Sequence, residues 1–397
     1  MYPVELAKGI YWVGAVDWNI RSFHGPALST HRGTTYNAYL ILDEHPTLVD
    51  TVWGPFTEVL MRNVTKVIDP AKLEYVVANH VETDHSGALP AIMAAAPSAK
   101  VVCSQRGRDG LRKHYFGDWH YQVVKTGDSI SIGRRTLSFV EAPMLHWPDS
   151  MFTYLVEDQI LMPNDAFGQH IATGFRFDDQ VRMDEVMEEA QKYYANILTP
   201  FSPLVARKLE EVAKMGIPIK MIAPSHGIIW RQNPGHIVDA YAKWARPGGD
   251  RSCVILFDTM WGATRRMAEE IGQGIVDAGA DVKILRASAT DTNDIIAEVH
   301  KAKGLVAGAP TVNRGMLVHV AKVLDELVGL RPAGKVAAAF GSYGWSGEAP
   351  PEIEEKLRKI GAEIVAEPLK VKWVPDDTEI QSCREWGRRI GEAVLRE

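Results

Sequence analysis

The sequence of 397 residues is poor in cysteine: Cys103, Cys253 and Cys383 lie far apart and form no CxxC pair. This scarcity argues against a disulfide framework, a thiolate zinc knuckle and a cysteine-ligated iron–sulfur or rubredoxin-type centre. The sequence also lacks a run of about 18 apolar residues that could cross a bilayer. Its N-terminus lacks a basic start, an apolar run and a small-residue cleavage site, so we expect a cytoplasmic protein that is not secreted.

An excess of positive charge is missing as well. The chain has 44 Lys and Arg against 50 Asp and Glu, and its net charge is −6. We therefore expect neither nucleic acid nor a membrane as a partner. The hydrophobic share of 46% and the charged share of 24% are typical of a soluble globular protein. The length favours two domains.

A Pro- and Gly-rich stretch, Ala245–Ser252, divides the chain into two parts with different patterns. We predict one domain over residues 1–248 and a second over residues 249–397. The first part has short β-type runs separated by turns, and "YNAYLIL" and "TLVDTV" predict a hairpin around "DEHP". Helices are predicted over Phe56–Val67, Asp184–Ile197 and Leu204–Met215.

In the second part, β-type runs alternate with helical segments. The five runs are "CVILFD", "DVKILRA", "GLVAGAP", "KVAAAFGS" and "EIVAEPL", and helices follow them from about residues 264, 292, 316, 351 and 377. Five strands alternating with five helices predict a parallel, doubly wound sheet.

The densest group of chemically active side chains lies in "NHVETDHSGALP", residues 79–90, directly after an apolar run. Taken alone, this group could be a solvated polar loop. Three more candidate ligands, however, each end an apolar run and precede a turn, as expected if several strands present their ends to one cleft. The candidate metal ligands are His80, Glu82, Asp84, His85, His146, Asp165 and His226.

Three loops of the second part predict a phosphate and ring site. Thr259, Gly262 and Thr264 offer hydroxyl and backbone N–H groups at a helix N-terminus, although this turn alone could equally be a helix cap. The turn is neither a P-loop nor a dinucleotide fingerprint. "GAPTVNRG" and "FGSYGWSGEAP" end the third and fourth strands near the predicted switch point of the sheet, and their aromatics could hold a flat ring or pack on another subunit. The pattern is similar to flavodoxin, which favours FMN. The predicted FMN contacts are Thr259, Met260, Trp261, Gly262, Ala263, Thr264, Pro310, Thr311, Asn313, Ser342, Tyr343, Gly344, Trp345 and Gly347.

The ligand pattern resembles the metallo-β-lactamase superfamily, whose members bind two metals between two β-sheets. Hydrolases of that superfamily normally have histidine where this chain has Glu82. The glutamate version, joined to a flavodoxin-like domain, resembles the flavodiiron proteins (A-type flavoproteins) over essentially the whole chain. The implied fold is an αββα sandwich followed by a flavodoxin-like doubly wound sheet. Independently of the resemblance, an added carboxylate favours iron or manganese over zinc.

The resemblance also implies roles for the ligands. His80, Glu82 and His146 would hold one iron, Asp84, His85 and His226 the other, and Asp165 would bridge them. The position of His85 is not a ligand in every member. His24, His170 and Tyr194 are candidates for pocket lining or proton supply, with a structural role equally open, and Trp147 is expected to pack.

The implied activity is reduction of dioxygen to water, of nitric oxide to nitrous oxide, or of both, with electrons delivered through FMN. The expected partners are an external donor (rubredoxin, a reduced deazaflavin or similar) and a second copy of the chain, in a head-to-tail dimer or a dimer of dimers. Two alternatives remain open. One is a zinc-dependent hydrolase of the metallo-β-lactamase type with a flavodoxin-like appendage. The other is a flavin-based electron carrier whose first part only mediates binding.

Overall fold

The computed structural model describes residues 2–25 and 27–396. The chain divides into two compact units, one made of Met1–Tyr193 and Pro203–Lys243, the other of Tyr194–Ser202 and Trp244–Glu397. The chain therefore passes between the units three times. The predicted boundary between residues 248 and 249 stays a prediction.

The first unit is built on two β-sheets. One sheet has the order β1 (Val4–Ala7), β2 (Ile10–Trp12), β7 (Tyr39–Ile41), β8 (Thr47–Val49), β9 (Tyr75–Val77), β10 (Lys100–Cys103), β11 (His120–Val123). The other has the order β12 (Ser129–Ser131), β13 (Thr136–Glu141), β14 (Met151–Leu155), β15 (Ile160–Met162), β16 (Met221–Ile222). The predicted hairpin is confirmed, because β7 and β8 pair antiparallel with Tyr39 opposite Val49.

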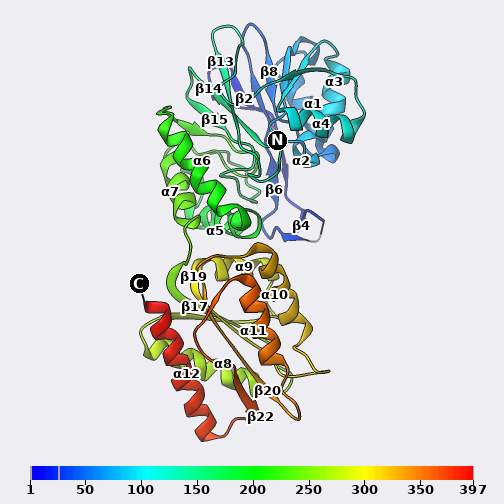
Figure 1. The fold of residues 1–397 in the computed structure, drawn as a ribbon. Helices are drawn as coiled ribbons and strands as arrows, with labels where there is room; N and C mark the ends of the chain where they lie inside the picture. The colour runs from blue at the N-terminus through cyan, green and yellow to red at the C-terminus, as the bar shows by residue number, and fades with distance from the viewer. Residues whose placement is uncertain (1, 26, 397) are drawn as a thin grey trace. The chain divides into compact units, whose positions relative to one another are not determined.

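The two sheets share one apolar core, to which both contribute buried side chains such as Ile41 and Val77 from the first sheet and Phe139 and Met162 from the second. Figure 1 shows the helices on the two outer sides. They are α1 (Thr57–Thr65), α2 (Thr83–Ser86), α3 (Leu89–Ala95) and α4 (Gln105–Tyr115) on one side, and α5 (Met183–Tyr193), α6 (Ser202–Lys214) and α7 (Pro234–Trp244) on the other. The arrangement confirms the predicted αββα sandwich. The single helix predicted over Asp184–Ile197 is instead α5 followed by a short π-helix, Tyr194–Leu198.

The second unit is a parallel sheet with helices on both faces (Figure 1). The strands are β17 (Asp250–Phe257), β18 (Asp281–Arg286), β19 (Ala302–Gly308), β20 (Val336–Tyr343), β21 (Glu363–Ile364) and β22 (Leu369–Lys372). The helices are α8 (Ala263–Asp277), α9 (Thr292–Lys301), α10 (Val318–Leu330), α11 (Ala349–Ile360) and α12 (Asp377–Leu395). The strand order β18-β17-β19-β20-β21 confirms the doubly wound, flavodoxin-like topology, with its switch point between β17 and β19.

Each face of this sheet has its own apolar core. Helices α9, α10 and α11 cover one face, and α8 and α12 cover the other. The fifth predicted strand, "EIVAEPL", is divided into β21 and β22, both of which pair with β20. Pro368 lies between them and cannot donate a ladder hydrogen bond, so the run is interrupted there.

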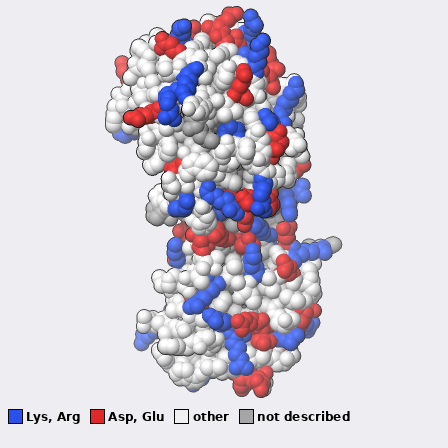
Figure 2. Space-filling model, turned by 180° about the vertical axis from the view of Figure 1, so that it is seen from behind, with Lys and Arg blue, Asp and Glu red and all other residues white. Residues whose placement is uncertain are grey.

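The surface carries both signs of charge. On the face drawn in Figure 2, Lys and Arg are interspersed with Asp and Glu rather than gathered into one field. Among the described residues, no helix is both long and apolar enough to cross a membrane.

Candidate functional site

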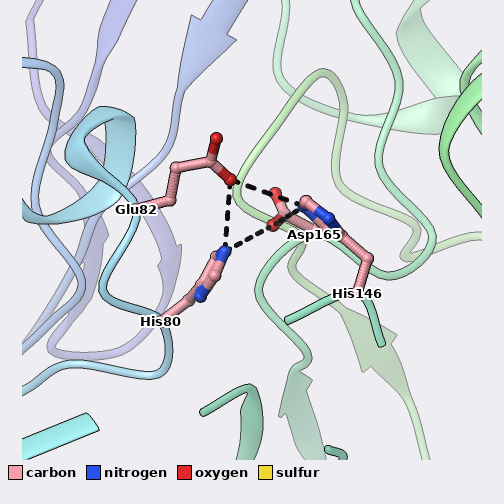
Figure 3. A group of neighbouring side chains, drawn as sticks. All are labelled: His80, Glu82, His146 and Asp165. Carbon is pink, nitrogen blue, oxygen red and sulfur yellow. Dashed lines mark hydrogen bonds and ion pairs between the residues drawn. The ribbon is translucent and has the colours of Figure 1, made fainter. Parts of the chain in front are cut away.

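The candidate metal ligands come from loops at the ends of strands in both sheets of the first unit. His80 follows β9, and Asp84 and His85 lie on the short helix α2, while Asp165 follows β15. His146 comes from the loop between β13 and β14, and His226 follows β16. Figure 3 shows His80 and Glu82 approaching from one side and His146 and Asp165 from the other. The structure thus brings together all seven ligands that the sequence analysis predicted.

Four of these side chains form a first group: His80, Glu82, His146 and Asp165. Glu82 Oε2 lies 3.2 Å from His80 Nε2 and 3.5 Å from His146 Nε2. Asp165 Oδ2 lies 3.8 Å from His80 Nε2 and 3.4 Å from His146 Nε2. Two imidazole nitrogens and two carboxylate oxygens therefore converge on one point (Figure 3).

The second group contains Asp84, His85 and His226. Asp84 Oδ2 lies 3.0 Å from His85 Nε2 and 3.1 Å from His226 Nε2. The other oxygen of Asp165, Oδ1, lies 2.9 Å from His85 Nε2 and 3.5 Å from His226 Nε2. Asp165 thus presents one carboxylate oxygen to each group.

Both groups fit metal ions. Donor atoms about 2.1 Å from one ion lie about 3.0–3.4 Å apart in octahedral or tetrahedral geometry, close to the separations observed. Among the described residues, several buried ligand atoms have no hydrogen-bond partner, including His85 Nε2, His146 Nε2 and Asp165 Oδ2. Unsatisfied buried polar atoms of this kind are rare unless an ion or water completes them. Nitrogen with carboxylate oxygen is a donor set that suits iron.

A layer of residues behind the ligands orients them. The carboxylate of Asp149 accepts a hydrogen bond from Val81 N at 2.7 Å and lies 3.1 Å from His80 Nδ1. His226 Nδ1 lies 2.6 Å from the carbonyl oxygen of Thr35. When the Nδ1 of each ring donates to these oxygens, Nε2 is left to face the metal. The sequence analysis missed Asp149, although a carboxylate three residues after His146 was a visible signal.

The charges of the site shift the pKa values of the candidate ligands. Burial opposes protonation of His80, but hydrogen bonds to Asp149 and Glu82 raise its pKa to about 10. Burial raises the pKa of Asp165, yet the charges of His85 and His146 hold it well below the usual range. Near pH 7, His80 therefore carries a proton until a metal displaces it, and Asp165 is ionised.

This charge state predicts that metal binding releases protons at pH 7. The Nε2 of His80 must lose its proton to become a ligand, and the raised pKa keeps that proton bound up to about pH 10. Metal affinity should therefore rise with pH across the neutral range. Calorimetric titration of metal-free protein with Mn²⁺, in two buffers of different ionisation enthalpy, measures the release. The control is His45→Ala, at a partly exposed histidine paired with Glu74. It should leave the number of protons released per bound metal unchanged.

A pocket of about 310 Å³ opens beside the first group. Its walls include Phe23, Tyr36, Trp53 and Glu82, together with His24, whose Nε2 lies 3.1 Å from Glu82 Oε1. Ser22, Thr83 and Asp84 also line it, so aromatic walls and polar groups both face the space. Space of this size and character suits a small uncharged molecule.

The other residues that the sequence analysis singled out near the site differ in their surroundings. His170 is buried, with Nδ1 2.8 Å from Thr34 Oγ1, and burial followed by the charge of His226 lowers its pKa well below the usual range. For Tyr194 the structure agrees with the structural role that was left open, because the side chain is buried and its hydroxyl lies 3.0 Å from Ser202 Oγ. The preceding Tyr193 is the one whose ring lies 6.3 Å from that of His226. Trp147 packs against the ligands, with its ring 5.0 Å from that of His80.

In the second unit, the three predicted loops meet at the carboxyl end of the sheet. Thr264 Oγ1 lies 2.9 Å from Ser342 Oγ, and the backbone N–H of Thr311 donates to Ser342 O at 2.9 Å. Gly262 caps α8 with φ +95°, and its N–H donates to Thr259 Oγ1 at 3.0 Å. Hydroxyls, backbone groups and a helix N-terminus are therefore held together, as a phosphate requires.

Large aromatic side chains stand exposed around these loops. The exposed fraction is 94% for Trp261 and 74% for Trp345. Trp373, which the sequence analysis missed, is also exposed, and its ring closely approaches the backbone of Gly344. Exposed aromatics beside a phosphate cradle fit the flat ring and phosphate of FMN, so the residues present suit this cofactor.

Gly262→Ala should weaken FMN binding about tenfold, because a left-handed residue with a side chain costs about 1–2 kcal/mol. A Cβ there meets no atom within 4 Å, so strain rather than collision is tested. Gly361→Ala is the matched control, since Gly361 has φ +92° and equally open space but ends α11. Titration followed by flavin fluorescence measures the FMN affinity of both variants. Equal FMN affinity in the two variants would contradict the role of the Gly262 loop.

Comparisons with known proteins agree with this architecture. The family model described as ODP family beta lactamase matches residues 34–227, and the flavodoxin family model matches residues 255–387. The chain is 55% identical over 394 residues to the nitric oxide reductase of Moorella thermoacetica, with 99% of each chain covered. It is 44% identical to the anaerobic nitric oxide reductase flavorubredoxin of Aeromonas hydrophila, over 98% of this chain and 79% of that relative.

Solved structures are similar over the whole chain. The rubredoxin oxygen:oxidoreductase of Desulfovibrio gigas matches with a TM-score of 0.96 at 38% identity, covering 99% of this chain and 98% of that one. The flavodiiron protein of Giardia intestinalis matches with a TM-score of 0.96 at 34% identity, covering 100% and 97%. These likenesses define the class, a flavoprotein that joins a binuclear metal centre to an FMN domain. The chain belongs to the flavodiiron protein family, and its cofactors are FMN and two non-haem irons.

Proposed function

We propose that this protein is an oxidoreductase that reduces nitric oxide to nitrous oxide, dioxygen to water, or both, with electrons delivered through FMN. The observation that carries the proposal is the carboxylate of Asp165, which presents one oxygen to each of two adjacent ligand groups. The names of its relatives support the choice of substrate, since they include nitric oxide reductase and rubredoxin oxygen:oxidoreductase.

We assign the ligands by the atoms that converge. His80, Glu82 and His146 would hold one iron, and Asp84, His85 and His226 would hold the other, with Asp165 between them. His85 differs from two of the other histidines, because its Nδ1 has no hydrogen-bond partner among the described residues, whereas Asp149 lies against His80 and Thr35 O against His226.

When bound, the irons supply open positions for the gas and store two electrons, and FMN supplies electrons singly or in pairs. The chain's own residues shape the reaction around them. Phe23, Tyr36 and Trp53 give the pocket aromatic walls that limit water. His24 touches Glu82 on one side and is partly exposed, so it is placed to pass protons from solvent to a substrate in the pocket. Both reactions consume protons, two for each nitrous oxide formed and four for each dioxygen.

The partners follow from the same proposal. An external carrier, rubredoxin or one of similar function, would deliver electrons, and a head-to-tail dimer or a dimer of dimers would set the flavin of one copy beside the irons of another. A cytoplasmic location remains part of the proposal.

Anaerobic turnover of reduced, iron-loaded protein with each gas tests the function. We expect nitrous oxide from nitric oxide, water without free peroxide from dioxygen, or both. The hydrolase alternative is not favoured. It would require zinc in the purified protein, with esterase or lactamase activity and no gas reduction. The electron-carrier alternative would require gas reduction to be unaffected by loss of the metals.

A further inference from the structure

A row of aromatic side chains leads from the metal centre to the surface of the first unit. Tyr115, the last residue of α4, has its hydroxyl 2.8 Å from Ser86 Oγ on α2. Ser86 directly follows the predicted ligand His85. The ring of Tyr115 lies 6.0 Å from that of Trp119, and the ring of Trp119 lies 6.2 Å from that of Tyr121, centroid to centroid.

We propose that Tyr115 and Trp119 form a relay for single electrons between the surface and the metal centre, separate from the flavin. Its use is to refill the centre when dioxygen or peroxide oxidises it and the flavin is short of electrons. The proposal rests on the proposed function only in requiring iron at the centre.

The hydrogen bond of Tyr115 suits it to be the inner member. Ser86 Oγ donates to the carbonyl oxygen of Val81 at 2.6 Å, so a lone pair of this hydroxyl is free to accept from Tyr115. When Tyr115 gives up one electron, its phenolic proton passes to solvent, which reaches this half-buried side chain. A proton returns from solvent when Trp119 replaces the electron, so electrons and protons both balance. Burial raises the pKa of Tyr115 more than the hydrogen bond with Ser86 lowers it, so the phenol keeps its proton near pH 7 before it is oxidised.

Trp119 suits the outer position. It lies in the turn between α4 and β11, is only partly buried, and its ring rests on the backbone of Gly117 so closely that a Cβ there would approach to 2.5 Å. Arg112, Lys113 and His114 form the exposed last turn of α4, and Asp118 is the exposed carboxylate next to Trp119, so this segment has a small excess of positive charge. An anionic organic reductant of the enediolate class, such as ascorbate, is attracted to such a surface and can return one electron to Trp119.

Tyr121 supplies a matched comparison within the same cluster. Its ring is as close to Trp119 as that of Tyr115, but its hydroxyl is buried without a hydrogen-bond partner among the described residues. A phenol with no proton acceptor is a poor electron donor, so the relay should run through Tyr115 and leave Tyr121 unused.

The test uses electron paramagnetic resonance. Protein that holds iron and FMN is mixed with a small excess of hydrogen peroxide and frozen shortly afterwards, and its spectrum is recorded. Peroxide oxidises the centre whichever gas the enzyme reduces, so the result is independent of the proposed substrate. We expect an organic radical in the wild type. Tyr115→Phe, with equal iron content, should lower it at least fivefold, and Tyr121→Phe should not change it. Trp119→Phe should keep the radical but slow its decay by ascorbate at least fivefold.

Steady turnover separates this relay from the main reaction. With ample reductant, the initial rate of gas reduction should be the same in Tyr115→Phe as in the wild type. Three results would overturn the proposal. They are a radical signal unaffected by Tyr115→Phe, a radical signal lost only in Trp147→Phe, and an initial rate of gas reduction that is lower in Tyr115→Phe than in the wild type.

Discussion

Asp165→Asn should empty both metal positions together and abolish gas reduction. The substitution keeps the size of the side chain but replaces one of the two oxygens that face the ligand groups with an amide nitrogen, which cannot bind a cation. It also removes the charge that holds His85 and His146 in place. Mutation of residues that only hydrogen-bond to metal ligands typically lowers metal affinity about 10–100-fold. Loss of a ligand itself should have a larger effect, so turnover should fall by more than about 100-fold.

Iron analysis and anaerobic gas reduction measure the effect. Asp178→Asn is the matched control, because Asp178 is also a buried carboxylate of this unit but accepts from the backbone N–H groups of Arg231, Gln232 and Asn233. It should lower stability and leave iron content unchanged. If Asp165→Asn kept its iron and its turnover, the assignment of Asp165 as the shared ligand would be wrong.

Glu82→His should shift the metal preference from iron toward zinc. The change lowers the number of carboxylates in the two groups from three to two and adds an imidazole, which suits zinc. It also removes the oxygen beside His24. With both metals supplied during refolding, the zinc-to-iron ratio should rise about tenfold, and gas reduction should fall by a similar factor or more.

Glu82→Gln separates charge from ligand type, because it keeps the shape and the contact with His24 but lacks the negative charge. It should lose iron without gaining zinc. Mass spectrometry after anaerobic metal loading measures the iron and zinc content of both variants. Iron content and turnover that survive Glu82→His unchanged would show that this glutamate does not select the metal.

The sequence predicted that the candidate ligands lie together, because most of them follow apolar strands and strand ends meet at one edge of a sheet. The apolar pattern alone placed His80, Asp165 and His226 each at such an end. Asp149 could not be placed in this way, because it acts by accepting from Val81 N and contacting His80 across the loop, a relation that no periodicity reveals.

Local backbone changes account for the other differences. The π-helix that begins at Tyr194 changes the direction in which successive side chains point, so Tyr193 rather than Tyr194 reaches the site. Pro368 divides the last predicted strand. Trp373 was missed because it lies beyond that break, where the sequence pattern no longer indicated which loop would approach Gly344.

The same π-helix bears on how the gene could be divided. Its Ala195 is fully buried in the core that α9, α10 and α11 form with the parallel sheet. The side-chain amide of Asn196 donates to the backbone carbonyl of Asn293, and the side-chain amide of Asn293 donates to Asn196 Oδ1. Part of the flavodoxin-like unit is therefore encoded between two segments of the first unit. A fragment cut at the Pro- and Gly-rich stretch would leave that part behind, with a hole in the core where Ala195 belongs. Exchange of the flavin unit between related genes would accordingly have to carry residues 194–202 along with it.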